Sequence, residues 1–277
     1  MNLVLQSPTL ERGDVDAIAD GARPSSIEKL SARAFRLKGA TPHDSVAKLA
    51  EARRIDYAWM EPGRRFADLK LLAMDMDSTL ITIECIDELG AIAGKGAEVA
   101  AITEAAMRGE IADYKDSLRR RVALLAGQPA GILESVYQSK LRLTPGAEQL
   151  LDACKRHGVK TLLVSGGFTF FTARLKDRLR LDYTISNTLQ TKAGSLTGTL
   201  TGDIVDADAK AAKFVAVMQE LKASKQQTVA IGDGANDLKM MAQAGLSVAF
   251  NAKPVVRAQA SCALTYSGLD GILNLFE

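Results

Sequence analysis

The chain has 277 residues, of which 35 are basic and 33 acidic, so its formal net charge is only +2. This balance gives no electrostatic basis for binding nucleic acid, and an aromatic content of 5% argues against stacking platforms for single strands. Three widely spaced cysteines, two histidines and the lack of a long apolar run predict a soluble cytoplasmic protein without disulfides, a zinc site or a membrane segment.

Residues 1–62 are predicted to form a small α+β N-terminal domain. In order, the apolar patterns indicate a strand at 2–5, a helix at 9–20, a strand at 34–38, a helix at 42–54 and a strand at 55–60. The 34–38 strand alternates and is expected to be half exposed. Because no catalytic constellation lies here, we expect a packing role or a homodimer contact, with a ligand sensor as the alternative.

After a linker at 61–65, the apolar run Leu71-Leu72-Ala73-Met74 stops at two carboxylates, Asp75 and Asp77. A short strand that is apolar on both faces is typical of a parallel sheet covered by helices. Ligands bind at the carboxyl ends of strands in such sheets, so these carboxylates are candidates for chemistry. Taken alone, the pair is explained equally well by a tight turn.

Residues 84–142 carry helical patterns and no convincing strand. Helices are expected at 86–93, 97–107, 112–126 and 130–141. An insert that directly follows the first strand can fold over the carboxyl end of that strand as a helical cap. On the third of these helices Arg121 lies beside the apolar face, whereas Arg119 and Arg120 are expected to point outward.

From residue 143 the α/β pattern resumes, and 69–83 with 143–277 are assigned to one core. Buried strands are predicted at 159–164, 228–231 and 246–250, with strands or a hairpin within 183–205 and helices between them. We therefore predict an α/β fold: a Rossmann-like parallel sheet with a helical-bundle cap inserted after its first strand.

Polar corners follow three of the predicted strands. These corners are Asp75 to Asp77, Ser165-Gly166-Gly167, and Gly232-Asp233 through to Asp237. In a parallel sheet they meet at one edge, and carboxylates brought close together repel one another unless a cation is present. Oxygen ligands without histidine favour a hard ion, and Mg²⁺ suits carboxylates combined with a substrate phosphate.

In this order the motifs Asp75-Met76-Asp77-Ser78-Thr79, Ser165, a lysine and Gly232-Asp233-Gly234-Ala235-Asn236-Asp237 resemble the haloacid-dehalogenase-like (HAD) phosphatase superfamily. Within it, the runs DMDSTLITIECIDELG, VSGGF and DADAK are similar to the phosphoserine phosphatase family over roughly residues 70–267. The resemblance implies hydrolysis of O-phospho-L-serine to L-serine and phosphate, the last step of serine biosynthesis.

The resemblance also implies roles for the acidic residues. Asp75 is the expected nucleophile, which forms an aspartyl-phosphate, and Asp77 is the expected general acid and then general base. Mg²⁺ is expected on Asp75, the main-chain carbonyl of Asp77, and Asp233. Asp237 is expected to support the site.

Substrate contacts are implied in the same way. The residues expected to bind substrate are Glu84, Met107, Arg121, Ser165, Gly166, Lys210 and Asn236, with Gly167 in support. Glu84 matches the ammonium of phosphoserine and Arg121 its carboxylate, while Met107 forms an apolar wall. Lys210 is preferred to Lys213, which lies on the same predicted helix.

One departure from the family pattern lies in the cap. One residue more than usual separates Met107 from the run that contains Arg121, and Tyr114 stands where a phenylalanine is usual. Arg121 is therefore the stronger expected contact. Alternative functions are a phosphatase for another small phosphomonoester, a phosphotransferase or phosphomutase, and an amino-acid-binding regulator in which residues 1–62 sense the ligand.

Overall fold

A computed structural model describes residues 1–108, 110–111 and 113–277, and the side chain of Met107 lies outside the description. Its larger sheet has the strand order β11-β10-β9-β5-β6-β7-β8. These strands are β5 (Leu71–Met74), β6 (Lys160–Phe168), β7 (Tyr183–Lys192), β8 (Ser195–Thr201), β9 (Thr228–Gly232), β10 (Leu246–Phe250) and β11 (Cys262–Leu264). Neighbouring strands are parallel except in the β7–β8 hairpin, which confirms the predicted parallel core.

The central strand β5 is buried on both faces. Leu72 and Met74 join the apolar cluster under α7 (Ala147–His157) and α8 (Thr169–Leu179). On the other face, Leu71 and Ala73 pack with side chains of α9 (Ala207–Glu220) and α10 (Leu238–Met241). Each fully buried leucine stabilises the fold by roughly 1.5–3 kcal/mol. The strand that ends at Asp75 is therefore held rigidly in the middle of the sheet.

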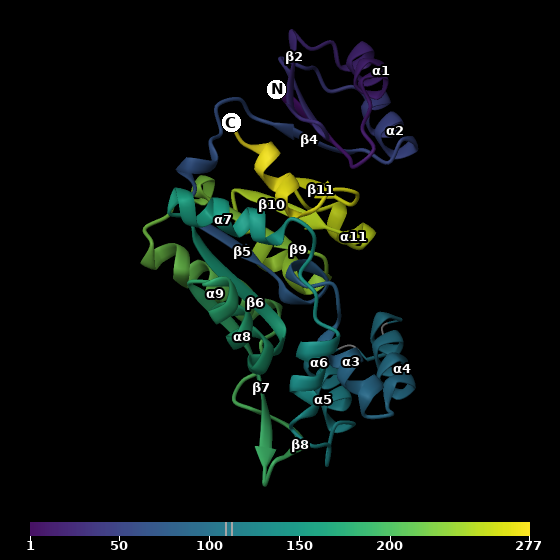
Figure 1. Cartoon of the computed structure of the whole chain (residues 1–277), viewed down its shortest axis with the longest axis vertical. Coiled ribbons are helices and arrows are strands. Elements are labelled where there is room, and N and C mark those ends of the chain that lie inside the picture. The colour runs from purple at the N-terminus through teal and green to yellow at the C-terminus, as the bar shows by residue number, and fades with distance from the viewer. Residues whose placement is uncertain (109, 112) are drawn as a thin grey trace.

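The helical insert forms a cap at one end of the molecule (Figure 1). It consists of α3 (Cys85–Ile92), α4 (Gly96–Met107), α5 (Tyr114–Ala123) and α6 (Ile132–Ser139), as predicted for this segment. Its two connections to the core pair with each other: the amide of Thr82 donates to the carbonyl of Arg142, and that of Thr144 to the carbonyl of Leu80, both at 3.0 Å. The cap thus starts and ends beside β5.

The cap is also bonded to the β7–β8 hairpin. The amide of Gly127 donates to the carbonyl of Leu196 at 2.9 Å, and the amide of Leu196 donates back to Gln128 at 2.8 Å. A third bond joins the amide of Ala130 to the carbonyl of Gly194 at 2.8 Å. The predicted hairpin is therefore present, and its outer part belongs to the cap as much as to the sheet.

The N-terminal region forms a separate antiparallel sheet with strand order β2-β3-β1-β4. Its elements are β1 (Asn2–Gln6), α1 (Arg12–Ala22), β2 (Ser26–Ser31), β3 (Ala34–Lys38), α2 (Asp44–Ala52) and β4 (Asp56–Met60). Strand β2 was missing from the prediction, which had one strand fewer. Its sequence SIEKLS has little apolar content, because this edge strand is largely accessible to solvent.

The expectation of a half-exposed strand at 34–38 was wrong, since β3 is buried on both faces. One face of the N-terminal sheet packs against α1 and α2, and the other meets the C-terminal segment Leu269–Leu275. The guanidinium of Arg36, only 5% exposed, crosses this contact and donates to the main-chain carbonyls of Asn274 and Phe276. The C-terminal segment, far away in sequence, thus covers the expected solvent face.

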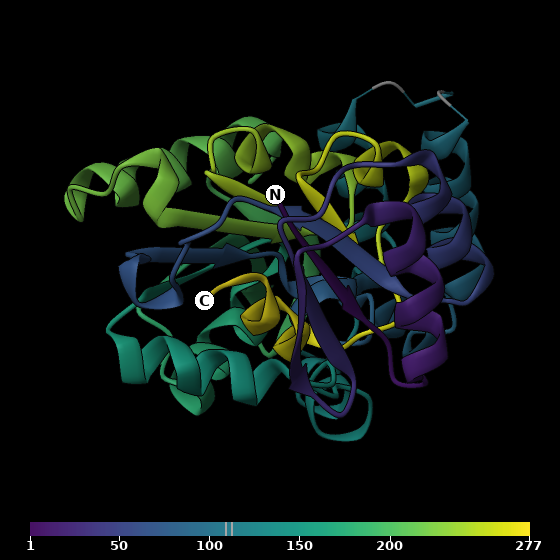
Figure 2. The same ribbon diagram turned by 90° about the horizontal axis from the view of Figure 1, so that it is seen from above.

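A second contact between the two sheets involves Asp56 at the start of β4. Its buried carboxylate accepts hydrogen bonds from the amides of Thr265 at 2.7 Å, Ser267 at 2.8 Å and Tyr266 at 3.0 Å. Burial raises the pKa of Asp56, and these three hydrogen bonds act in the opposite direction. The edge strands β4 and β11 therefore lie side by side, as the view from above shows (Figure 2).

We propose to divide the chain into an N-terminal domain at 1–62, a core at 69–83 and 143–277, and a cap at 84–142. The two sheets and their distinct apolar clusters support this division. Figure 1 shows the N-terminal sheet and the cap at opposite ends of the core. No helix among the described residues is long and apolar enough to cross a bilayer.

Replacing Arg36 with alanine removes a buried guanidinium and leaves two carbonyl groups without their donor. We expect the free energy of unfolding of the N-terminal domain to fall by about 2 kcal/mol or more. Urea unfolding followed by the fluorescence of Trp59, the sole tryptophan, measures this change. The exposed Arg33→Ala is the control and is expected to stay within about 0.5 kcal/mol; an equal loss in both variants would contradict the role of Arg36.

Candidate active site

The carboxyl ends of β5, β6 and β9 meet at a cavity of about 670 Å³ beneath the cap. Asp75 directly follows β5, Gly166 and Gly167 lie near the end of β6, and Asp233 directly follows β9. The cap contributes the remaining wall. The cavity lining includes Asp75, Asp77, Ser78, Glu84, Asp87, Tyr114, Arg121, Gly166, Gly167, Asp233 and Asn236 from the motifs and the cap, and Asn251 and Lys253 from the loop between β10 and α11 (Pro254–Arg257).

The turn after β5 directs its two carboxylates differently. The amide of Met76 donates to Oδ1 of Asp75 at 2.7 Å, which fixes that carboxylate at the end of the strand. Ser78 then adopts a positive φ of 55°, which turns the chain sharply. Asp77 accepts a hydrogen bond from the amide of Cys85, the first residue of α3, at 3.2 Å. Asp77 is thereby anchored to the cap.

A buried ion triad lies beneath the cavity. The ammonium of Lys210, on α9, is 2.9 Å from Oδ2 of Asp75 and 2.8 Å from Oδ1 of Asp237. Lys210 and Asp237 are fully buried. Burial acts to lower the pKa of Lys210, but the charges of Asp237 and Asp75 outweigh it and raise that pKa above its ordinary value. The ammonium therefore stays charged and orients Asp75.

Lys213, the alternative lysine, does not join this triad. Its ammonium lies 5.9 Å from the centre of the Tyr183 ring on the surface of the sheet. Because Lys210 is in the first turn of α9, its side chain reaches the sheet edge, whereas Lys213 is almost one turn further along.

Two glycines allow the close approach of these acidic groups. Asp237 also accepts a hydrogen bond from the amide of Gly234 at 3.1 Å, which occupies its second oxygen. A Cβ at Gly232 would lie 2.5 Å from the Asp237 side chain, and one at Gly167 would lie 2.8 Å from Oδ2 of Asp77. Any larger residue at either position would displace a carboxylate of the site.

Burial, together with neighbouring negative charge, raises the pKa values of Asp75 and Asp233. Burial, followed by the charges of Asp237, Asp233 and Asp77, raises the pKa of Asp75 well above its usual value, although Lys210 opposes this. Burial and Asp237 likewise raise the pKa of Asp233 to about 6. The site is therefore electrostatically suited to receiving a cation.

The donor set fits a divalent metal ion. Among the described residues, oxygen atoms of Asp75, Asp233 and Asp237 lie within 4.8 Å of one another. Three carboxylates with one ammonium, Lys210, leave a local charge close to −2, which Mg²⁺ would balance. Asp75 and Asp233 line the cavity, whereas Asp237 is fully buried beneath it with both oxygens bonded, so Asp75 and Asp233 are the better ligands. Thr79 donates to Oδ1 of Asp233 at 3.0 Å, and Oδ2 accepts no hydrogen bond from another described residue, so Oδ2 is available to a metal ion.

The segment Ser165-Gly166-Gly167, where the register of β6 against β7 shifts, has the features of a phosphate site. Ser165 is fully buried, and its Oγ accepts the amide of Gly167 at 2.8 Å, which leaves its own proton free to donate. The carbonyl of Gly166 is held by the side-chain amide of Asn187 at 2.7 Å. Asn187 also accepts the amide of Val205 at 2.8 Å. No sequence motif pointed to this isolated asparagine.

Two cap residues of opposite charge face the cavity. Glu84 accepts a hydrogen bond from the hydroxyl of Ser78 at 2.7 Å. The surrounding protein desolvates the Glu84 carboxylate and so raises its pKa, although the side chain lines the cavity. Arg121 lines the same cavity, whereas Arg119 and Arg120 are exposed. Asp87, which the sequence reasoning missed, lines the same cavity. It follows Glu84 by three residues, about one helical turn.

Tyr114 lies closer to the reacting groups than expected. A Cβ at Gly166 would clash with the Tyr114 hydroxyl, so this hydroxyl lies directly beside Gly166. Burial raises the pKa of Tyr114 to about 12, although Lys210 and Arg121 oppose this, so the hydroxyl remains a donor. Met107, the expected apolar wall, has its side chain outside the described part of the chain.

Comparisons with known proteins extend this description. A model of haloacid dehalogenase-like hydrolases matches residues 72–242, and one of a domain of unknown function matches residues 3–44. A phosphoserine phosphatase from Polaromonas sp. is 56% identical over 220 residues, which cover 78% of this chain and 93% of that protein.

Solved structures agree with this result. The unliganded crystal structure of a probable phosphoserine phosphatase from Vibrio cholerae has a TM-score of 0.87 at 37% identity, and the match covers 99% of this chain and 86% of that one. A substrate-bound phosphoserine phosphatase complex has a TM-score of 0.71 at 36% identity, covering 76% and 99%. The resemblance in the sequence is thus confirmed, and the chain belongs to the haloacid dehalogenase-like hydrolase family.

Proposed function

We propose that the chain is a phosphoserine phosphatase, which hydrolyses O-phospho-L-serine to L-serine and phosphate in the cytoplasm. The observation that carries this proposal is the Asp75 carboxylate, held by Lys210 at the floor of a cavity whose cap wall offers Glu84 and Arg121. The phosphoserine phosphatases to which the chain is similar support the same substrate.

In the first step, an oxygen of Asp75 attacks phosphorus and the bond from phosphorus to the serine oxygen breaks. Lys210 and the amide of Met76 hold the carboxylate in place for this attack. Ser165 and the amide of Gly166 bind the non-transferring phosphate oxygens. Asp75 and Asp233, with the carbonyl of Asp77, would hold Mg²⁺, which neutralises charge on the phosphate.

Asp77 supplies and then removes a proton. It is the general acid for the departing serine alkoxide, and afterwards it takes a proton from the water that attacks the aspartyl-phosphate and releases phosphate. Burial, with the nearby charge of Glu84, raises the pKa of Asp77 to about 7. A carboxyl group in that range carries a proton near neutral pH and can also give it up.

The cap selects the amino-acid end of the substrate. Glu84 pairs with the ammonium and Arg121 with the carboxylate, while Tyr114 covers the phosphate side near Gly166. Because these groups come from the cap, the site is complete only with the cap over the sheet edge, which also limits the access of water.

Asp75→Asn removes the nucleophile while keeping the shape of the side chain. We expect phosphate release from O-phospho-L-serine to fall by at least about 10⁴-fold. Steady-state assays with and without Mg²⁺ measure this, and chelation of the metal should abolish wild-type turnover. Lys213→Gln, on the surface of the same helix as Lys210, is the control and should retain activity. Substantial turnover by Asp75→Asn would refute the proposed intermediate.

Asp77→Asn tests the proton donor through the leaving group. We expect kcat/KM for phosphoserine to fall by about 10²–10⁴-fold, and the phosphorylation step with p-nitrophenyl phosphate, whose leaving group needs no proton, to be much less affected. In the wild type kcat/KM should fall as pH rises above about 7, because Asp77 then loses the proton it must donate. Equal losses with both substrates would argue against this role.

Arg121→Gln tests selectivity. We expect kcat/KM for phosphoserine to drop roughly 10–100-fold, the loss for one charge-assisted contact, with little change for phosphoethanolamine, which lacks the carboxylate. Arg120→Gln is the matched control, since Arg120 is exposed and pairs with Asp116 at 2.8 Å. If Arg121→Gln lowered kcat/KM equally for both substrates, the proposed phosphatase reaction would stand, but the assignment of Arg121 to the carboxylate would be refuted.

A further inference from the structure

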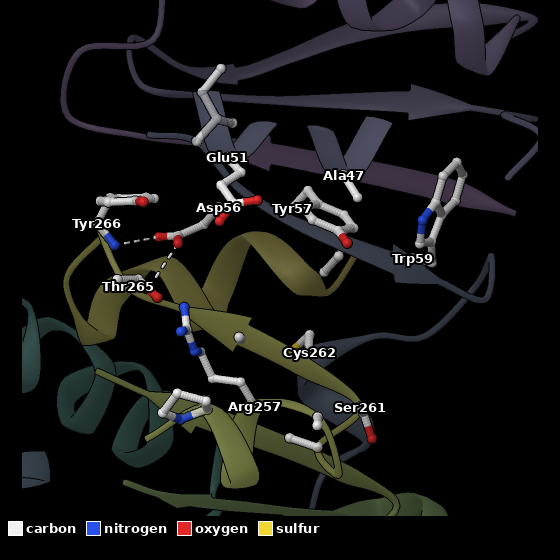
Figure 3. A pocket seen from close by; sticks show the side chains of 16 residues that line it. Ala47, Glu51, Asp56, Tyr57, Trp59, Arg257, Ser261, Cys262, Thr265 and Tyr266 are labelled. Carbon is white, nitrogen blue, oxygen red and sulfur yellow. Dashed lines mark hydrogen bonds between the residues drawn. The ribbon is translucent and has the colours of Figure 1, made fainter. Parts of the chain in front are cut away.

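A second cavity, of about 580 Å³, lies between the N-terminal domain and the core (Figure 3). Strand β4 and helix α2 form one wall, and β11 with α11 (Pro254–Arg257) forms the other. It exists only because the two sheets dock through Asp56 and Arg36. The proposed phosphatase reaction makes no use of it.

The walls of this cavity are aromatic. Tyr57 and Trp59 project from alternate positions of β4, and Tyr266 follows β11. In Figure 3 the hydroxyl of Tyr57 points into the cavity. The ring of Tyr266 also lies 5.5 Å from the guanidinium of Arg54. Such walls accept an apolar or planar group of a ligand.

Arg257 supplies the charge that recognises the other end of a ligand. Its guanidinium extends into the cavity (Figure 3), and it makes no ion pair or hydrogen bond with another described residue. Asp56 is not available to it, because the Asp56 carboxylate already accepts three main-chain amides. A planar guanidinium without an ionic partner is suited to a carboxylate.

Glu51 is the third charged residue of the lining, after Arg257 and Asp56. It lies on α2 and is exposed to solvent. Arg257 is exposed as well, and the two side chains form no ion pair with each other, so solvent screens the charge of Glu51 and it does not neutralise Arg257 directly. The lining thus combines aromatic surface with an arginine that has no ionic partner among the described residues.

Helix α11 connects this cavity to the active site. The amide of Arg257 donates to the carbonyl of Lys253 at 3.1 Å, and the amide of Lys253 donates to the carbonyl of Asp233 at 3.2 Å. Lys253 and Asn251 line the active-site cavity, while Pro254 and Arg257 line the second one. A ligand that displaces α11 therefore acts on the main chain of a residue expected to hold the metal ion.

We propose that this cavity is a second binding site, for a small organic carboxylate with an apolar body, and that its occupancy alters the phosphatase activity through α11. The carboxylate pairs with Arg257, and the body packs against Tyr57, Trp59 and Tyr266. The binding part of this inference does not depend on the reaction catalysed at Asp75.

Trp59 provides a direct readout, since it is the sole tryptophan and lines the cavity. The full chain is titrated with 3-phenylpropionate and 4-methylpentanoate, with 3-phenylpropanamide as the uncharged analogue and acetate as the carboxylate without a body. We expect saturable fluorescence changes with the first two and none with the others. No saturable change with either carboxylate, or equal binding of the amide, would overturn the site.

Matched variants identify the recognition group. Arg257→Gln should weaken binding of 3-phenylpropionate by about tenfold or more and leave turnover without ligand unchanged. Glu51→Gln, on the opposite wall, should bind the ligand at least as tightly as the wild type, because it removes a negative charge that would repel the ligand carboxylate. Equal weakening in both variants would overturn the assignment of Arg257.

The link to the active site is measured separately. Saturating 3-phenylpropionate should change kcat/KM for O-phospho-L-serine in the wild type, and the same concentration should have little effect on Arg257→Gln. Binding without any change in kcat or KM would overturn the transmission through α11. If the chain had no phosphatase activity at all, the proposed function would fail, while the fluorescence titration would still decide the binding site.

Discussion

The site depends on one buried ammonium, that of Lys210. Without it, the carboxylates of Asp75 and Asp237 would lie close together in a region of low dielectric, where like charges repel strongly. With it, Asp75 is oriented but not neutralised, because two carboxylates share one positive charge and Asp233 adds a third negative group. Breaking such a buried network by removing one partner costs about 3–5 kcal/mol. The arrangement is stable only where the rest of the sheet holds these groups in place.

The core sheet and the cap therefore contribute different groups to the site. The groups that would act on phosphate project from the ends of β5, β6 and β9 and from α9, all packed into the core. The groups that would read the amino-acid end project from α3 and α5, which lie in the cap. Asp77 connects the two, since its carboxylate is bonded to the first amide of α3. The groups proposed to act on phosphate are thereby held rigidly in the core. The proposed contacts to the amino-acid end of the substrate depend on the position of the cap.

Much of this arrangement could be predicted because it is local or periodic. The run of apolar residues before Asp75, the glycines after two other strands and the helical spacing of the insert identify the core, the cap and the edge where they meet. What could not be predicted depends on distant docking. Asn187 has no motif around it, and only the fold brings it to Gly166. The strand at 34–38 looked half exposed because the covering segment lies more than 200 residues away. The short strand β11 and the polar strand β2 have too little apolar pattern to stand out.

The bonds between the cap and the β7–β8 hairpin have a consequence for motion. Strand β7 pairs with β6 as far as Asn187 and with β8 from Thr188 onward, so its outer half belongs to the hairpin. If the cap swings away with its hairpin contacts intact, β7 has to flex next to Asn187. That side chain holds the carbonyl of Gly166 in the part of β6 that we propose binds phosphate. Cap opening would therefore weaken the proposed phosphate contacts near Gly166 as the cavity opens to solvent. Product release would then be coupled to cap movement.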